Sequence, residues 1–344
     1  DEEVRRLYIE GSEGGFETLP CRDASLADLS EQLIAAYVGQ RQATSGRPLG
    51  LSHEEMLRSL GCLVEQNGKW TPTHAGIMLF AEDPQRFISQ TEVACVRFKG
   101  ADVVSYVDRR DLRGPLYQLV DDAEQFIYRH MKVGRRIEGF VGVEYREYPQ
   151  AAVREAIVNA VVHRDYGRRG QRIRIFMFDD RIEVYSPGTL PPGVSLEKMR
   201  RLEPQSVLRN PTIVGVLRDL GSQYIERLGT GVRRMAAAME TQGLPKPQFE
   251  EVGSEFRVTL MGPGERFMAE AGAPPAWSKG LNERQLEAVL YAGEHGRITN
   301  REYRDLFKVS NYTAAMDLRA LMEKQLIEAV GEGRGRFYRL AWGT

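Results

Sequence analysis

Cysteine and histidine are scarce in this chain of 344 residues. The three cysteines, Cys21, Cys62 and Cys95, have no CxxC spacing, and the five histidines form no HxxxH pair. These absences exclude a disulfide framework and a structural zinc site as the basis of the fold. We interpret the cysteines as reduced, partly buried thiols of a cytoplasmic protein.

Long apolar segments and a strong net charge are also missing. No apolar run approaches the roughly 18 residues of a membrane-spanning helix, and no signal peptide is visible, so no membrane partner is expected. The net charge of −1 excludes a basic coat, so any contact with nucleic acid must be confined to one module. The motif GxxxxGK[ST] is absent, which excludes a motor core of the P-loop kind.

The length and the glycine and proline pattern of the chain predict several domains. A chain of 344 residues exceeds one ordinary core. Because residue 1 is Asp, we interpret residues 1–49 as the tail of a missing N-terminal domain with a linker. Residues 50–145 are predicted to form a connecting α/β region and 146–261 an α/β layer. A Gly/Pro-rich linker at 262–280 then leads to a separate small domain at 281–344.

A helix with a polar face is predicted at residues 150–166, after Pro149. Glu155, Asn159 and His163 follow one another at intervals of four, so they share one side of that helix. A carboxylate can orient or deprotonate a water, and an amide oxygen can ligate a hard cation such as Mg²⁺. The spacing by itself leaves a solvated polar face as the alternative, because such polar pairs are common.

Glycines follow at positions that suit phosphate binding. Residues 171–178 and 181–186 alternate as a strand hairpin, and the loop after it opens with Ser186-Pro187-Gly188. Further along, Gly229-Thr230-Gly231 opens a helix at 232–241, and a final strand completes the layer. Backbone N–H groups at a helix N-terminus are ready donors to phosphate, so these glycines extend the candidate site.

This order of elements resembles the GHKL (Bergerat) ATP-binding fold. In that fold a helix carrying ExxxN, a hairpin, a glycine turn, a lid and a Gly-rich helix start follow one another. The chain is most similar to the divergent branch of prokaryotic regulators labelled RecG-like helicase C-terminal, which carry an Alba/Schlafen-type nucleic-acid-binding domain in front. The motifs that carry the resemblance are Ala75-Gly76-Ile77-Met78-Leu79-Phe80, Asp83-Pro84-Gln85-Arg86-Phe87, Arg109-Arg110-Asp111, Arg154-Glu155-Ala156 through Asp165-Tyr166, and Gly229-Thr230-Gly231.

The resemblance implies a site for ATP and Mg²⁺. Glu155 would be the general base or water-orienting residue, and Asn159 would ligate Mg²⁺. Ser186 stands near the base, where the wider family has an Asp, and a hydroxyl is a weaker acceptor for the adenine amino group. The other residues of the implied nucleotide site are His163, Gly188, Gly229, Thr230 and Gly231.

Three helices and a Gly-rich hairpin are predicted after the linker. Asn282, Thr299 and Ser310 are each placed to cap a helix, and two short strands then flank the glycines of residues 331–335. This is the pattern of a winged helix, in which the third helix approaches base edges or phosphates. The candidate DNA-binding residues are Ser310, Asn311, Tyr312, Thr313, Arg319, Arg334 and Arg336.

Together these features predict an α+β multidomain protein with a GHKL-like α/β sandwich followed by a C-terminal winged helix-turn-helix. The favoured function is a DNA-binding transcriptional regulator that binds ATP and Mg²⁺ to adjust oligomerisation or affinity for double-stranded DNA. One alternative is a slow Mg²⁺-dependent ATPase in DNA transactions. Another is a nucleotide-independent scaffold that uses the α/β layer for dimerisation. Because Glu323, Glu328 and Glu332 dilute the basic charge of the C-terminal module, a winged helix used for protein contacts or dimerisation is the alternative to DNA binding there. A homo-oligomer is expected.

Overall fold

The chain folds into two compact units. The computed structural model describes residues 15–46, 50–138, 141–205, 207–222, 224–225, 229–264, 267 and 276–341. Residues 1–131 and 148–264 form the first unit, and residues 132–147 and 265–344 form the second. The second unit is therefore discontinuous in sequence, because it combines a segment from the middle of the chain with the C-terminal end.

A six-stranded mixed sheet lies at the centre of the first unit. Its order is β4-β3-β7-β8-β10-β9, in which β3 and β7 run parallel and the other neighbours antiparallel. In β7, Ile173, Ile175 and Met177 are buried and alternate with partly exposed residues, so one face of the sheet meets the core. The strands are β3 (Val93–Phe98), β4 (Tyr106–Leu112), β7 (Ile173–Met177), β8 (Arg181–Pro187), β9 (Gln248–Val252) and β10 (Glu255–Met261).

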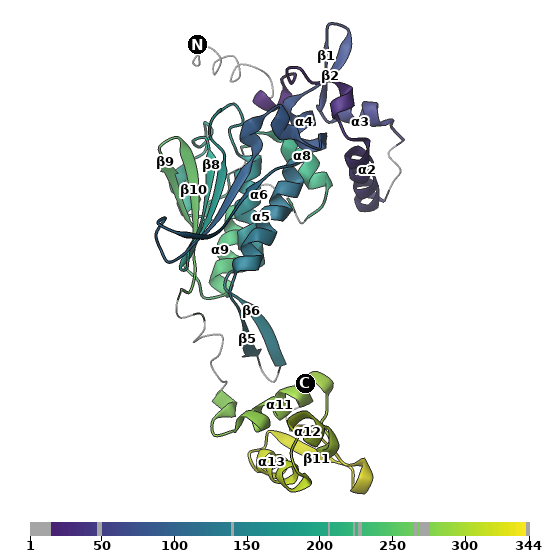
Figure 1. Ribbon diagram of the computed structural model, residues 1–344, viewed down its shortest axis with the longest axis vertical. Helices are drawn as coiled ribbons and strands as arrows, with labels where there is room; N and C mark the ends of the chain where they lie inside the picture. Colours follow the sequence, from purple (N-terminus) through teal and green to yellow (C-terminus); the bar gives the residue numbers. More distant parts are fainter. Residues whose placement is uncertain are drawn as a thin grey trace. The chain divides into compact units, whose positions relative to one another are not determined.

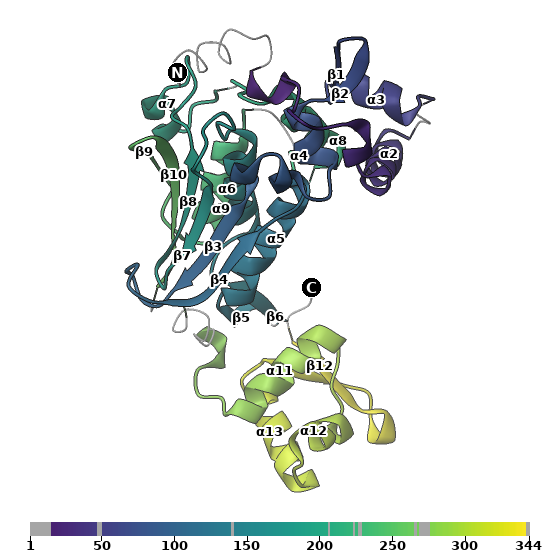
Figure 2. The same ribbon diagram turned by 45° about the horizontal axis from the view of Figure 1, so that its top comes forward.

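That face of the sheet is covered by helices α5 (Leu116–His130), α6 (Gln150–Val162) and α9 (Gly231–Thr241), as Figures 1 and 2 show. The central helix is α6, which packs against both other helices and against β8 and β10. Eight of its 13 residues are buried, among them Ala156 and Ala160, whose small side chains permit close approach. Polar residues of α6 are therefore confined to the few positions that its neighbours leave open.

The remaining helices and strands of the first unit come from the N-terminal part of the chain and from the segment before α9. Glu17 is fully buried and caps α8, accepting hydrogen bonds from the backbone N–H of Thr212 at 2.7 Å and of Ile213 at 3.0 Å. Burial raises the pKa of Glu17 to about 7. These elements are α2 (Glu31–Ser45), α3 (His53–Ser59), β1 (Leu63–Gln66), β2 (Lys69–Pro72), α4 (His74–Phe80), α7 (Leu196–Arg200) and α8 (Pro211–Asp219).

The N-terminal segment is more ordered than a tail and a linker would be. Helix α2 continues to Ser45, and the Tyr37 hydroxyl donates to Asp219 at the end of α8 over 2.8 Å. Residues 1–14 and 47–49 lie outside the described residues. Since α2 docks on α8 through Tyr37 and through the ion pair of Arg41 with Asp219, residues 31–45 belong to the first unit.

The central sheet takes strands from two regions that the sequence pattern separates. Strands β3 and β4 come from the predicted connecting region, residues 50–145, yet β3 pairs with β7 from the predicted α/β layer. The register places Val93 opposite Ile173, far along the chain. Sequence periodicity identifies a strand but not its partner, so this pairing could only come from the tertiary structure.

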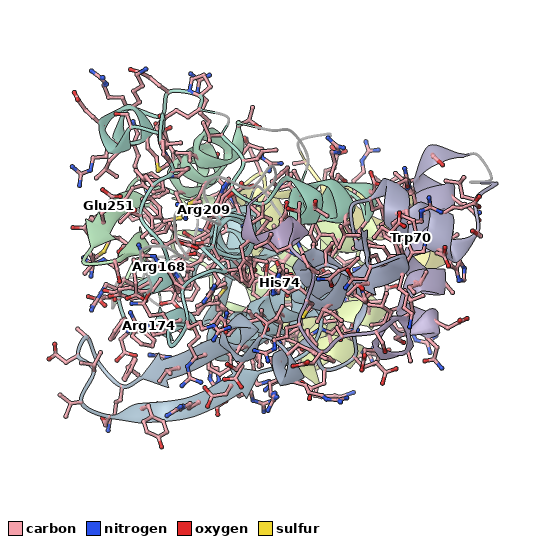
Figure 3. All side chains as sticks on the ribbon, turned by 90° about the horizontal axis from the view of Figure 1, so that it is seen from above. Trp70, His74, Arg168, Arg174, Arg209 and Glu251 are labelled. Carbon is pink, nitrogen blue, oxygen red and sulfur yellow. The ribbon has the colours of Figure 1, made fainter. Side chains whose placement is uncertain are left out.

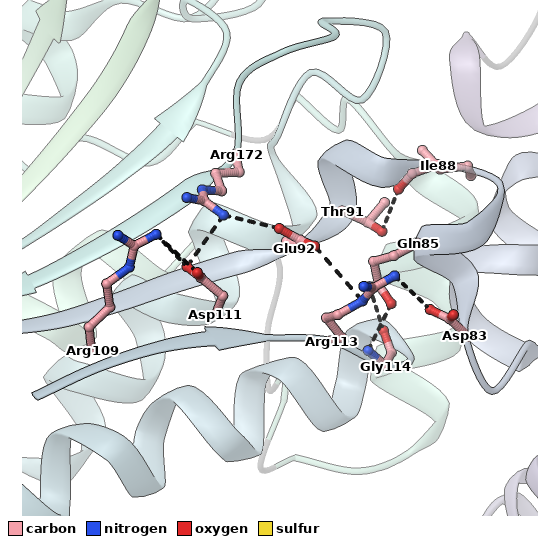
Figure 4. A network of polar contacts seen from close by, with 10 residues as sticks. All are labelled: Asp83, Gln85, Ile88, Thr91, Glu92, Arg109, Asp111, Arg113, Gly114 and Arg172. Atoms are coloured by element: carbon pink, nitrogen blue, oxygen red, sulfur yellow. Dashed lines mark hydrogen bonds and ion pairs between the residues drawn. The ribbon is translucent and has the colours of Figure 1, made fainter.

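A network of ion pairs joins the ends of these strands (Figure 4). Arg172, just before β7, contacts Glu92 at 3.0 Å and Asp111 of β4 at 3.3 Å. Arg113 contacts Asp83 at 3.2 Å and Glu92 at 3.8 Å. Two of the motifs that resemble the regulator family, at residues 83–87 and 109–111, therefore brace the sheet rather than line the site described below.

Among the described residues of the second unit, the α-helices with assigned bounds are α11, α12 and α13, which accompany two strand hairpins. The side chains of Asn282, Thr299 and Ser310 accept hydrogen bonds from the third backbone N–H of their helices, which confirms all three predicted caps. Ile298 and Tyr338 exchange backbone hydrogen bonds of 2.8 Å, which ties the last hairpin to the start of α12. The elements are β5 (Val133–Glu138), β6 (Val141–Arg146), α11 (Glu283–His295), α12 (Asn300–Phe307), α13 (Asn311–Glu323), β11 (Ile327–Val330) and β12 (Phe337–Leu340).

The β5–β6 hairpin is absent from the sequence prediction. It leaves the chain between α5 and α6, and β6 packs against α11 of the C-terminal helices. Tyr145 of β6 stacks on Phe267 with ring centroids 5.5 Å apart. Of the predicted linker at 262–280, residues 265, 266 and 268–275 lie outside the described residues.

A buried carboxylate fixes the three C-terminal helices to one another. Asp317 of α13 accepts hydrogen bonds from Asn282 at 3.2 Å, Gln285 at 2.9 Å and the Tyr303 hydroxyl at 2.9 Å, and it pairs with Arg284 at 3.1 Å. Burial by itself would raise the pKa of Asp317, but the hydrogen bonds from Tyr303, Asn282 and Arg284 outweigh it and lower the pKa. The carboxylate thus stabilises the arrangement of α11, α12 and α13.

We predict that Asp317→Ala destabilises the second unit by about 2–4 kcal/mol, because four donors lose a buried acceptor. The matched control is Glu323→Ala in the same helix, which removes an exposed carboxylate paired with Arg319. That change should cost less than about 0.5 kcal/mol. Calorimetric unfolding of the two variants measures both effects, and equal losses would contradict the role of Asp317.

Candidate functional site

A cavity of about 160 Å³ opens in the first unit between α6, α9, the sheet and the segment 188–209. One buried water occupies roughly 10–15 Å³ of such space, so this cavity has room for a ligand of about ten or more heavy atoms. Its wall is mostly apolar, with polar groups at two ends, as is typical of small-molecule sites. The polar and glycine residues that line it are Glu155, Asn159, His163, Ser186, Gly188, Thr189, Glu203, Gln205, Arg209, Gly229, Gly231, Arg233 and Arg234.

Helix α6 supplies the polar floor of the cavity. The Asn159 side-chain amide donates to Glu155 Oε1 over 3.0 Å, one helical turn away. Because the amide nitrogen of this cavity-lining residue donates to Glu155, its Oδ1 atom keeps its capacity as an acceptor. The predicted pairing of Glu155 with Asn159 on one face of the helix is therefore present in the structure.

The start of α9 lies directly against these two side chains. A Cβ atom added to Gly231 would lie 1.8 Å from Glu155 Oε1 and 3.5 Å from Asn159 Nδ2, so any larger residue there would displace the Glu155 carboxylate. Arg234, in the first turn of the same helix, donates to Glu155 Oε2 and forms an ion pair with it. The sequence analysis found the glycines but missed Arg234, since an arginine on a helix carries no signal that names its partner.

The other end of the cavity is built by the turn after β8. Ser186 is buried, and its hydroxyl donates to the carbonyl oxygen of Ala160 over 2.8 Å, so its proton is already committed to α6. Gly188 has φ 112°, and a Cβ there would lie 2.5 Å from Arg209 and 2.7 Å from Asp165. The turn therefore requires glycine both for its backbone conformation and for its close contacts.

Arg209 joins this turn to the end of α6. Its guanidinium donates to the carbonyl oxygen of His163 at 3.0 Å and to that of Thr189 at 2.6 Å. The next residue, Asn210, is buried and donates to the carbonyl oxygens of Val162 and Arg164. Arg209 lies with Arg168 and Arg174 toward the sheet in Figure 3, away from Trp70 of the β1–β2 hairpin. Arg209 is thus a further cavity residue that the sequence analysis missed.

The segment over the cavity has internal hydrogen bonds. The Gln205 side chain accepts from the Ser195 N–H at 2.6 Å and donates to the Ser195 carbonyl oxygen at 2.9 Å, which closes the loop around α7. Arg233 of α9 donates to the Leu202 carbonyl oxygen at 2.7 Å. The segment between the Gly188 turn and α8 is thus a structured loop that covers the cavity.

The structure brings most of the predicted nucleotide-site residues together. Glu155, Asn159, His163, Ser186, Gly188, Gly229 and Gly231 all line the cavity, and Thr230 immediately precedes α9. Among the described residues no group of three or more His, Cys, Asp or Glu side chains could hold a metal ion. Any Mg²⁺ at Asn159 would therefore need phosphate and water as its other ligands.

A known protein family matches a part of the chain that contributes many residues to this cavity. Residues 170–260 match the family described as "Putative ATP-dependent DNA helicase recG C-terminal". The chain contains an ATPase-like domain. The match covers β7, β8, the cavity cover, α9 and the last two strands of the sheet, and it begins after Glu155 and Asn159. No curated protein matches the chain.

A solved structure shares the fold of this ATPase-like domain and its surroundings. The DIP2311 protein of Corynebacterium diphtheriae superposes with a TM-score of 0.54 at 20% sequence identity, over 99% of this chain and 73% of that chain. At this level of identity the likeness concerns the fold alone.

Within the described residues, no helix is long and apolar enough to span a membrane.

The candidate DNA-binding residues lie at the exposed start of α13, further along α13 and on the last hairpin. Asn311 is exposed, and Tyr312 has 76% of its surface exposed at the helix start. Ser310 is used as the helix cap, accepting from the N–H of Thr313 at 3.1 Å. Arg319 pairs with Glu323 in its own helix, the Arg336 guanidinium lies 5.4 Å from the Tyr338 ring, and the Arg334 side chain lies outside the described residues.

His163 gives the ATPase-like domain a testable pH dependence. Burial, with a smaller contribution from the cationic Arg209, lowers the pKa of His163 from 6.5 to about 4. The native protein thus keeps His163 neutral while the unfolded chain takes up a proton, so the stability contributed by neutral His163 is present above 6.5 and is lost as the pH falls toward 4.

We predict that His163→Gln flattens this dependence. Across the window from 6.5 down to 4, the wild-type free energy of unfolding should fall faster than that of the variant by up to about 1.4 kcal/mol per pH unit. Urea unfolding of both proteins at several pH values measures the two slopes. Other titrating groups, Glu17 among them, are common to both proteins. Equal slopes would therefore contradict the lowered pKa of His163 in the native protein.

Proposed function

We propose that this chain is a DNA-binding transcriptional regulator whose ATPase-like core binds ATP with Mg²⁺. The observation that carries the proposal is the convergence of the Glu155–Asn159 pair, the Gly231 helix start and the Gly188 turn on one cavity. In this arrangement the phosphates meet the N-terminus of α9 and Asn159 provides an oxygen ligand to Mg²⁺. Ser186, Gly188 and His163 then border the base.

Hydrolysis is the second candidate function, with Glu155 as the base. Its two carboxylate oxygens accept hydrogen bonds from Asn159 and from Arg234, which orient the group. Each oxygen keeps a second lone pair, so these contacts do not prevent it from accepting a proton from a water. Because Ser186 stands where the wider family has an Asp, we favour nucleotide binding that controls oligomerisation or DNA affinity over rapid turnover in a DNA transaction.

The DNA-binding part of the proposal concerns the C-terminal module, which we infer to be a winged helix. Its support is the order α11, α12, α13, β11, β12 together with the Ile298–Tyr338 bridge and the exposed start of α13. Residues 281–344 contain ten Lys or Arg and nine Asp or Glu, a net charge of only +1. Modest affinity for double-stranded DNA is expected from one module, and a homo-oligomer would raise it by presenting two.

Binding of ATP is tested by calorimetric titration of the whole chain in the presence of Mg²⁺. Asn159→Ala should weaken binding at least about tenfold, because the bound Mg²⁺ loses its protein ligand. Asn300→Ala, a substitution of the same kind in the second unit, should leave the affinity unchanged. If the wild-type chain releases no heat and binds no nucleotide, the scaffold alternative gains and the nucleotide part of the proposal is lost.

Binding of DNA is tested by fluorescence anisotropy with double-stranded oligonucleotides over a series of salt concentrations. Arg336→Gln should reduce the slope of log affinity against log salt by about one, because one phosphate contact is removed. Tyr312→Ala should weaken binding roughly 5- to 100-fold. Arg22→Gln, which alters an exposed arginine of the first unit, is the control of equal charge. An unaltered affinity in both module variants would refute DNA binding by the start of α13 and the last hairpin.

A further inference from the structure

The Glu155 carboxylate lies in this cavity beside the first residue of α9 and pairs with Arg234. It lies against the first residue of α9, since a Cβ atom on Gly231 would be 1.8 Å from Oε1 and 2.7 Å from Cδ. The N-terminus of an α-helix carries partial positive charge and unpaired N–H groups, and α9 is 11 residues long. A carboxylate of the protein itself therefore lies beside the helix start at which the proposed function has the phosphates bind.

The same carboxylate also holds the nearest cation. Arg234 donates to Glu155 Oε2, and only 11% of the Glu155 side chain and 34% of the Arg234 side chain are exposed. Both residues line the cavity, together with Arg209 and Arg233. With Asn159 donating to the other oxygen, the carboxylate is bound on both sides and neutralised in place.

We propose that Glu155 is a resident anion of the phosphate cradle, and that a polyphosphate ligand binds by displacing it from Gly231 and Arg234. Arg234 then pairs with the ligand, and Glu155 is released toward the cavity. This proposal rests on the proposed function, because the cradle is the phosphate end of the same nucleotide site. It names the ligand class as a polyphosphate and assigns Arg234 as the residue that exchanges partners.

Charge explains why displacement needs several phosphates. A carboxylate and a phosphate cannot share one helix N-terminus without strong repulsion in a partly buried cavity. A triphosphate carries several negative charges against the single charge of Glu155, so it competes for Arg234 and also meets the neighbouring Arg233. A nucleoside without phosphates offers no such competition and leaves Glu155 in place.

Displacement also changes what Glu155 can do. In the ligand-free state each of its oxygens accepts one hydrogen bond, whereas loss of Arg234 removes the bond to Oε2 and the positive charge beside it. The Glu155–Arg234 pair thus couples the presence of phosphate to the orientation and the charge environment of the carboxylate.

The experiment is calorimetric titration of the whole chain with inorganic triphosphate, and separately with ATP and Mg²⁺. Glu155→Gln keeps the size of the side chain and removes the competing charge, so triphosphate should bind at least about tenfold more tightly. Glu203→Gln is the matched control, because Glu203 lines the same cavity but pairs with Arg201 and not with Arg234. It should change the affinity less than about threefold, as general electrostatics alone would predict.

The partner exchange is tested at Arg234. Arg234→Gln should weaken triphosphate binding at least about tenfold, and Arg234→Lys, which keeps the charge, should recover part of it. Arg233→Gln removes the same charge from the neighbouring position, where the side chain bonds the Leu202 carbonyl oxygen, and should weaken binding less. Glu155→Asp is a further variant, which keeps the negative charge on a shorter side chain. Circular dichroism of each variant separates loss of folding from loss of binding.

The outcomes separate this inference from the proposed function. If ATP binds the wild-type chain and Glu155→Gln equally, the resident-anion proposal is overturned and the nucleotide site stands. If triphosphate binds Glu155→Gln more tightly while ATP binds neither protein, the proposal stands and the ATP assignment fails. If the folded Glu155→Gln and Glu155→Asp variants bind neither probe, the cradle itself is refuted.

Discussion

Burial of α6 between the sheet and two flanking helices is the constraint on which the first unit depends. A polar group buried without a partner costs about 1–3 kcal/mol, so each polar residue of this helix must find one. Two consecutive residues do so in opposite directions. Arg154 pairs with Asp121 and Glu124 of α5, and Glu155 pairs with Arg234 of α9. These contacts fix the helix between its neighbours and leave its remaining polar positions to face the cavity.

Two glycines then determine how closely the rest of the site can approach α6. At Gly231 the backbone of α9 reaches Glu155, and at Gly188 the turn after β8 reaches Asp165 and Arg209. A side chain at either position would separate the surfaces, because the neighbouring atoms lie well inside van der Waals contact. The cavity therefore has a polar end at each glycine and an apolar wall between them, a geometry that suits a ligand with a charged and an uncharged part.

Sequence patterns predicted those features in which a residue contacts its close neighbours along the chain. The caps at Asn282, Thr299 and Ser310 are of this kind, because a cap and its helix lie within four residues. Strand β4 and the β5–β6 hairpin escaped prediction. In β4 every residue is at least partly exposed, so its sequence lacks the apolar alternation that marks a half-buried strand. Arg209 and Arg234 escaped as well, since their partners lie far along the chain.

The sequence by itself determined the mixed α+β class, the helix caps and the shared face of Glu155, Asn159 and His163, because each of these depends on spacing within one element. The tertiary structure alone decided that β3 joins β7, that the middle hairpin groups with the C-terminal helices, and that Arg234 meets Glu155. These contacts join segments separated by many residues, and their free energy depends on packing that no local pattern encodes.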